Sequence, residues 1–167
     1  ILGVNTVGRL NEIIAANEIK DFVKVAEALH EKKIAAIADQ IASNPSIKWI
    51  LIAGPSSSGK TTFAKRLAIQ LRVNGLRSVT LGTDDYVVDR AHTPRTSAGE
   101  YDFEHLHAVD VATLNRDLAD LDAGREVELP AFDFHTGSRT YKGRKMRLDE
   151  DQVVVLEGIH SLNPELT

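Results

Sequence analysis

The sequence predicts an α/β fold in which a parallel sheet carries helices on both faces and follows a helical extension. Short apolar runs at 47–53, 78–81 and 152–156 have the length and composition of buried strands. Helical patterns at 60–73 and 109–121 alternate with them, an order typical of parallel sheets. A loop rich in glycine and serine joins the first strand to the first of these helices.

One clear helical pattern precedes the first strand. Apolar residues recur from Asp21 to Ser43 at a spacing of about 3.6 residues, with Asp21 as a candidate cap. Pro45 ends the pattern, because proline disfavours a helical residue before it. We expect residues 1–45 to form a helical linker or extension that serves packing, and residues 46–167 to form the α/β domain.

The segments after the second strand are less regular. Residues 86–108 are expected to be a loop, residues 126–134 an extended segment, and residues 136–138 a turn. Asp110 is a candidate cap for the helix at 109–121.

Composition excludes several kinds of protein. The chain is 43% hydrophobic and 26% charged, which is ordinary for a soluble domain. The absence of cysteine excludes disulfides and thiolate sites and suits a reducing cytoplasm. A net charge of −4 gives no sign of a nucleic-acid partner, and no apolar run approaches the ~20 residues of a membrane span. The oligomeric state stays open, with a homo-oligomer among the options.

The loop after the first strand fits the pattern G-x-x-x-x-G-K-[ST] without deviation. Its glycines allow backbone N–H groups to turn inward, and the helix that follows adds its positive end. Lys60 offers an ammonium to phosphates and Thr61 a hydroxyl to Mg²⁺. The alternative is a plain turn with an exposed lysine, but the flanking strand and helix favour an ATP site made of Gly54, Pro55, Ser56, Ser57, Ser58, Gly59, Lys60, Thr61 and Thr62.

Carboxylates follow the other two strands. Glu157 ends the strand at 152–156, where an acidic side chain can hold Mg²⁺ beside the phosphates. Asp84 and Asp85 follow the strand at 78–81, at the sheet edge where ligands of such folds bind. An aspartate there could accept a proton from an attacking hydroxyl. The alternatives are a polar strand end and a solvated turn.

Two further groups are more ambiguous. The segment 101–107 mixes aromatic, acidic and histidine residues, which could hold a sugar or base or serve only loop packing. A basic cluster could approach phosphates or be a solvated turn; it comprises Arg139, Lys142, Arg144, Lys145 and Arg147.

Four segments in order resemble the uridine kinase group of P-loop kinases, which includes phosphoribulokinase and pantothenate kinase relatives. They are 54–62, 83–86, 129–134 and 155–159, and the resemblance runs from about Ile47 to Asn163. It implies a P-loop NTPase fold and phosphoryl transfer from ATP to a small-molecule hydroxyl, with the 5′-hydroxyl of uridine or cytidine as the first candidate. The alternatives are another sugar or polyol as acceptor, or a non-catalytic nucleotide-binding module.

The resemblance also implies roles for matching residues. Asp84 corresponds to the catalytic base, Glu157 to the Mg²⁺-associated acid, and Glu104 to an aspartate that holds ribose hydroxyls. Lys60 and Thr61 correspond to the phosphate and metal contacts. The expected acceptor site comprises Tyr86, Phe103, Glu104, Phe132, Phe134 and Arg139.

Three positions depart from the family pattern. Gly137 stands where uridine kinases carry a histidine that touches the base, and Phe132 and Val87 stand where they carry tyrosines. These departures remove hydrogen bonds expected for pyrimidine recognition. The helix around 27–34 resembles the linker of longer bacterial members that carry a domain similar to part of threonyl-tRNA synthetase. We therefore expect a fragment of a longer chain, with the lid arginines of the family beyond Thr167.

Overall fold

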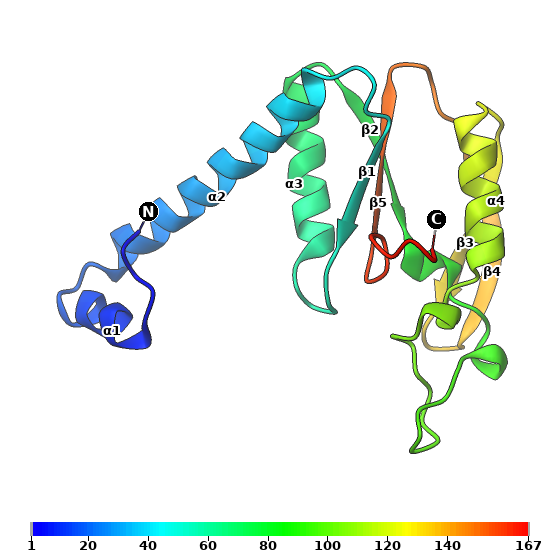
Figure 1. Ribbon diagram of the computed structural model, residues 1–167, viewed down its shortest axis with the longest axis horizontal. Helices are drawn as coiled ribbons and strands as arrows, with labels where there is room; N and C mark the ends of the chain where they lie inside the picture. Colours follow the sequence, from blue (N-terminus) through cyan, green and yellow to red (C-terminus); the bar gives the residue numbers. More distant parts are fainter. Residues whose placement is uncertain (1, 167) are drawn as a thin grey trace.

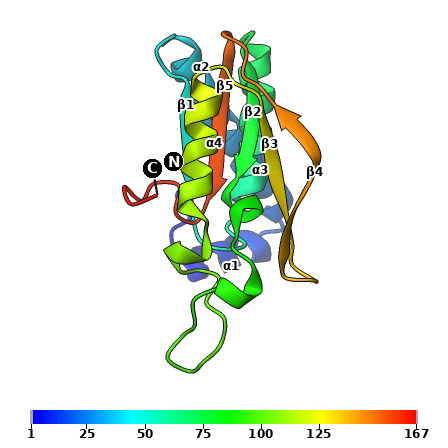
Figure 2. The ribbon, with the colours of Figure 1, turned by 90° about the vertical axis from the view of Figure 1, so that its right-hand side faces the viewer.

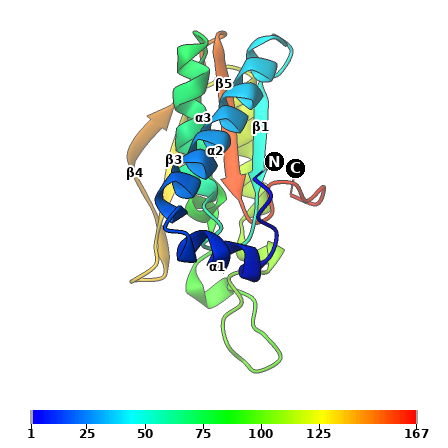
Figure 3. The same cartoon turned by 90° about the vertical axis from the view of Figure 1, so that its left-hand side faces the viewer.

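The computed structural model describes residues 2–166, so the outermost residue of each expected domain lies outside it. Its centre is a parallel sheet in the order β1-β5-β2 (Figure 1). Helices α2 and α3 lie on one face, and α4 lies on the other (Figures 2 and 3). The predicted α/β architecture is confirmed. The sheet strands are β1 Trp49–Ala53, β2 Arg77–Gly82 and β5 Gln152–Gly158, and a hairpin adds β3 Val127–Asp133 and β4 Ser138–Met146.

The helices match the sequence patterns closely, and α3 has the expected bounds. Asp110 caps α4 as predicted, with its Oδ1 accepting from the backbone N–H of Thr113 at 3.0 Å. α2 begins two residues before the expected Asp21, with Glu18 at its N-cap. No described helix has both the length and the apolar character that crossing a bilayer requires. The helices are α1 Val7–Ala15, α2 Ile19–Ala42, α3 Lys60–Val73 and α4 Val111–Asp122, and the short 3₁₀ turns are η1 Thr83–Tyr86, η2 Arg90–His92 and η3 Leu106–Ala108.

Each face of the sheet has its own core, because successive side chains of β5 point to opposite faces. Val153 packs with residues of α2 and α3, whereas Val154 and Leu156 pack with residues of α4. The run 153–156 is therefore buried on both sides, which explains why it reads as a continuous apolar stretch.

The extension is anchored to the helix that follows the phosphate loop. Ile34, Ala38 and Ile41 occupy one face of α2 and pack against Leu67 and Leu71 of α3. The first half of α2 projects from the sheet and ends beside α1 (Figure 1). The carboxyl-terminal half of α2 is thus part of the same core as α3, the helix that follows the phosphate loop.

Strand β4 was not expected from the sequence. It pairs antiparallel with β3, and most of its residues are at least partly exposed, so no apolar alternation marks it. Three of its four basic side chains form ion pairs with neighbouring acids. Arg139 pairs with Asp110, Arg144 with Asp85 and Lys145 with Glu126.

Candidate functional site

The phosphate loop, residues 54–61, has the backbone needed to cup an anion. Ser57 and Gly59 adopt left-handed conformations, with φ of 57° and 89°. A non-glycine residue is rarely found in this region, which marks Ser57 as a strained position. Gly59 precedes α3 without any side-chain cap, so the first amides of that helix are left for a ligand.

Gly54 lies at a close approach inside this loop. A Cβ atom there would lie 2.8 Å from Ser58 Oγ. Lys60 crosses the loop, and its Nζ donates to the carbonyl oxygen of Pro55 at 3.0 Å. The lysine ammonium is therefore held beside the amides, where both can face the phosphates of a nucleotide.

Two oxygen groups meet beside the loop, although they are far apart in sequence. Thr61 Oγ1 donates to Glu157 Oε1 at 2.5 Å. Glu157 lies near the end of the central strand, level with Ile52 of β1 and Gly82 of β2. Hard oxygen donors of this kind suit Mg²⁺. Since residues 2–166 contain no cluster of three or more His, Asp or Glu fit to hold a metal, phosphate and water would supply the remaining ligands.

Asp84 lies on η1, directly after β2, and faces the same region. Burial is the main cause that raises the pKa of its carboxyl, and the carboxylates of Glu157 and Asp85 add to it. The Lys60 ammonium acts in the opposite direction. An aspartate with a raised pKa, close to the ammonium of Lys60, is suited to accept a proton.

A cavity of about 240 Å³, which we call the Asp84 cavity, joins the phosphate loop to the segment 101–108. Both Lys60 and Asp84 line it. Of the expected acceptor residues, Phe103, Glu104 and Phe134 lie in its wall. The complete lining is Ser56, Lys60, Asp84, Val87, Phe103, Glu104, Phe134 and Ile159.

The other three expected acceptor residues lie elsewhere. Tyr86 is buried in the core, and its hydroxyl donates to Asp117 at 3.2 Å. Phe132 packs edge-on against Phe134, with 4.9 Å between the ring centroids. Phe134 lines the cavity, whereas Phe132 is not one of the lining residues. The Arg139 guanidinium donates to Asp110 at 2.8 Å, which commits it to the start of α4.

Sequence reasoning missed two residues that shape the cavity. Ile159 lines it directly. The Nε2 atom of His160 lies 2.7 Å from the carbonyl oxygen of Glu104. Because a carbonyl oxygen can only accept a hydrogen bond, the imidazole N–H is the donor. This bond ties the segment that carries Phe103 and Glu104 to the end of β5. Only their position two and three residues after Glu157 could have drawn attention to them.

Gly158 allows Glu157 and Asp84 to come close together. A Cβ atom at position 158 would lie 1.9 Å from Oγ1 of Thr83, a buried residue directly before Asp84. We expect Gly158→Ala to lower the free energy of unfolding by about 1–3 kcal/mol, the usual cost of overpacking, as measured by urea denaturation.

Gly82→Ala is the matched control for this substitution. A Cβ atom at Gly82 meets nothing within 4 Å, and its backbone has ordinary extended angles. Equal stability of the two variants would contradict the close approach of Gly158 and Thr83.

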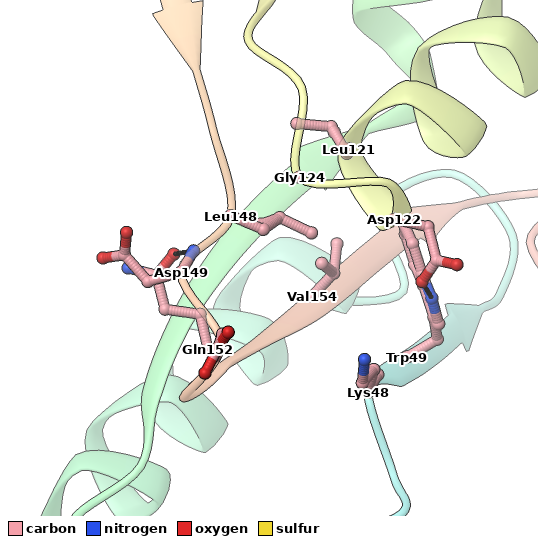
Figure 4. Close-up of a pocket in the computed structure, with 10 residues that line it drawn as sticks. Lys48, Trp49, Leu121, Asp122, Gly124, Leu148, Asp149, Gln152 and Val154 are labelled. Atoms are coloured by element: carbon pink, nitrogen blue, oxygen red, sulfur yellow. Dashed lines mark hydrogen bonds between the residues drawn. The ribbon is translucent and has the colours of Figure 1, made fainter.

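Another hollow, of about 110 Å³, lies at the opposite end of the sheet, where β1 and β5 begin (Figure 4). Trp49 lines one side of it and donates from Nε1 to Asp122 at 3.2 Å. Lys48, Asp149 and Gln152 border it. It lies at the far end of β1 from the phosphate loop, so we place the candidate active site at the Asp84 cavity.

Comparison with known proteins identifies relatives of this chain. A model of the phosphoribulokinase / uridine kinase family matches residues 49–165. A uridine kinase of Chloroflexus aurantiacus is 35% identical over 108 residues, which are 65% of this chain and 50% of that protein. Arabidopsis thaliana "Inorganic pyrophosphatase TTM2" is 33% identical over 123 residues, which are 74% of this chain but 17% of that protein.

The solved structures include a possible uridine kinase from Bacillus stearothermophilus. It superposes with a TM-score of 0.68 at 28% identity, over 81% of this chain and 74% of that one. The chain spans about half the length of the uridine kinases that it matches. It has the P-loop NTPase fold, and it belongs to the phosphoribulokinase / uridine kinase family of phosphotransferases.

Proposed function

We propose that this protein transfers the γ-phosphoryl group of ATP to a hydroxyl of a small molecule. The observation that carries the proposal is that Lys60 of the phosphate loop and the carboxylate of Asp84 line one cavity. A donor phosphate on the loop and an acceptor hydroxyl near Asp84 would face each other across it. Catalysis of this transfer is mostly positioning and charge stabilisation.

Each group of the site has a defined task in this proposal. The loop amides and Lys60 bind the β- and γ-phosphates and neutralise part of their charge. Thr61 and Glu157 would hold Mg²⁺, which supplies further neutralisation of phosphate charge when bound. Asp84 orients the acceptor hydroxyl and takes its proton. Phe103 and Phe134 exclude water from one side of the cavity.

The acceptor has two candidate classes. Uridine or cytidine is supported by relatives named uridine kinase and by the aromatic wall of the Asp84 cavity. A different sugar or polyol is supported by Val87, which lines the cavity with an apolar side chain, and by Gly137, which has no side chain. A site without polar partners for a base does not select strongly for one.

An acceptor screen with the full-length protein tests the proposal. ADP formation from ATP and Mg²⁺ is measured with nucleosides, sugars and polyols, and with no acceptor. We expect ADP formation to depend on one class of acceptor. Tight ATP binding without acceptor-dependent turnover would instead indicate a non-catalytic nucleotide-binding module, and phosphate release without acceptor would indicate hydrolysis.

The pH dependence of turnover provides a further prediction. Asp84 must be deprotonated to act as a base, and its pKa is raised above the ordinary value, mainly by burial. We therefore expect kcat/KM to fall as the pH drops through a pKa higher than that of an exposed aspartate. The measurement is a pH profile of kcat/KM, and an acid limb at or below the ordinary aspartate pKa would contradict the assignment.

A further inference from the structure

The middle of α4 buries a carboxylate that has no task in the proposed reaction. Asp117 is 2% exposed, and it is the only acid that is buried among residues 2–166. It shares the buried side of the helix with Leu114, Leu118 and Leu121. An apolar residue is typical of such a position, because a buried charge lowers stability unless other groups pair with it. An aspartate there indicates that its hydrogen bonds matter.

Tyr86 is the partner that ties this carboxylate to another element. Its hydroxyl donates to Oδ2 of Asp117 at 3.2 Å, and both side chains are almost completely buried. Oδ1 of Asp117 accepts from Nη2 of Arg116, its neighbour on the same helix, at 2.9 Å. Burial is the main cause that raises the pKa of the Tyr86 hydroxyl, and the charge of Asp117 adds to it. The phenol therefore keeps its proton at neutral pH and donates to a charged acceptor, which makes a stronger bond than a neutral one does.

Tyr86 is also the last residue of η1, the turn that carries Asp84. A 3₁₀ turn of four residues has little stability of its own, so contacts with other elements fix its place. The backbone carbonyl oxygen of Tyr86 accepts from the N–H of Asp110 at 2.8 Å, and the far end of its ring is held by Asp117. Two attachment points fix both the position and the direction of the turn. The ion pair of Asp85 with β4 adds little, because its side chains are partly exposed to water.

We propose that Asp117 is a positioning residue for the phosphoryl transfer. Through the Tyr86 hydroxyl it fixes η1 so that the Asp84 carboxylate faces the acceptor hydroxyl. This inference rests on the proposed function, since it names the residue that orients the base. Asp117 is buried and does not line the Asp84 cavity, so it touches neither the acceptor nor the nucleotide. A base must lie within about 3 Å of the group whose proton it takes, and a displacement of about 1 Å can lower the rate by ~10²-fold.

Tyr86→Phe tests this inference, because it removes the hydroxyl and keeps the ring in the core. ADP formation from ATP and Mg²⁺ is measured with the full-length protein and with uridine or ribose as acceptor. We expect kcat to fall about 10-fold and the Kd for ATP to stay unchanged. Asp117→Leu keeps the branched shape of the side chain but accepts no hydrogen bond, so it should lower kcat by the same factor. Asp117→Asn keeps an oxygen that can accept from Tyr86 and should retain most of the turnover.

The double variant Tyr86→Phe/Asp117→Leu separates positioning from packing. Replacement of both partners of a buried hydrogen bond by apolar groups is often nearly neutral for stability. Urea denaturation should therefore find the double variant at least as stable as Asp117→Leu. Its kcat should stay as low as in each single variant, because all three lack the same bond.

Asp120→Leu is the matched control for Asp117→Leu. Asp120 lies on the same helix and pairs with Arg125, just after the end of that helix. Its loss should leave kcat unchanged.

A crystal structure of Tyr86→Phe tests the position of Asp84 without depending on turnover. We expect the Asp84 carboxyl group to be displaced, or spread over more than one conformation, relative to the unsubstituted protein. Three results would overturn the inference: an unchanged kcat in Tyr86→Phe, an unmoved Asp84 carboxyl group, or a kcat that recovers together with stability in the double variant.

Failure of this inference is distinguishable from failure of the proposed function. Acceptor turnover that is insensitive to Tyr86→Phe would remove only the role of Asp117. A displaced Asp84 in a protein that shows no acceptor turnover in its unsubstituted form would remove only the proposed phosphoryl transfer.

Discussion

Lys60→Ala is expected to lower the affinity for ATP severely. The ammonium lies beside the loop amides through its bond to the Pro55 carbonyl oxygen, and it also lines the Asp84 cavity. Loss of one partner from a desolvated charge pair costs about 2–5 kcal/mol, which lowers affinity by roughly 30- to 5,000-fold. Titration calorimetry with ATP and Mg²⁺ measures the change.

Lys65→Ala serves as the control, because Lys65 is an exposed lysine on the same helix. It should bind ATP as the unsubstituted protein does. Both variants should unfold at similar temperatures, since Lys60 belongs to neither of the two described hydrophobic cores. Equal ATP affinity of the two variants would remove Lys60 from the phosphate site.

Asp84→Asn is expected to spare ATP binding and to lower acceptor-dependent turnover by about 10²-fold or more, the usual size of a lost acid–base role. The amide keeps the shape of the carboxyl but cannot take a proton at neutral pH. Initial rates of ADP formation at saturating ATP measure the effect. Asp85→Asn is the matched control, because Asp85 pairs with Arg144 at 3.2 Å and does not line the cavity.

Asp84→Asn is expected to lower turnover without lowering the stability of the fold. The folded protein raises the pKa of Asp84, so the fold disfavours its charged form. The charged carboxyl therefore lowers the free energy of unfolding. This loss is absent at pH values below the pKa of the unfolded state, where the carboxyl is protonated in both states. It is complete at pH values above the raised pKa of the folded state. Asp84→Asn should therefore be no less stable than the unsubstituted protein at neutral pH.

Undiminished turnover in the Asp84→Asn variant would remove Asp84 from the base role.

Local patterns were sufficient to predict most of the sheet and its helices. The helix over 60–73 and the buried run at 152–156 follow from apolar periodicity, and the phosphate loop follows from a motif with the required strand and helix on either side. These features depend on neighbouring residues, so a single sequence contains them. α1 lies within the extension that was expected to be helical, but its bounds were not predicted.

The candidate site was only partly predictable. Phe103, Glu104 and Phe134 line the cavity, and their role in holding an acceptor stays a prediction. Tyr86 and Arg139 follow the same motifs, but their side chains bond to Asp117 and Asp110, and sequence patterns do not specify such partners.

Close approaches between distant segments were beyond sequence reasoning altogether. The contact of Gly158 with Thr83 and that of Gly137 with Arg90 each join segments more than 40 residues apart. A glycine in the sequence indicates neither which segment approaches it nor how near that segment comes.

A crystal structure of the full-length protein with Mg²⁺ and a non-hydrolysable ATP analogue tests the central claim most directly. We predict polyphosphate oxygens within hydrogen-bonding distance of the loop amides and Lys60 Nζ, the metal beside Thr61 and Glu157, and the γ-phosphate facing Asp84 across the cavity. A nucleotide bound elsewhere, or Asp84 and Glu157 turned away from its phosphates, would contradict the account.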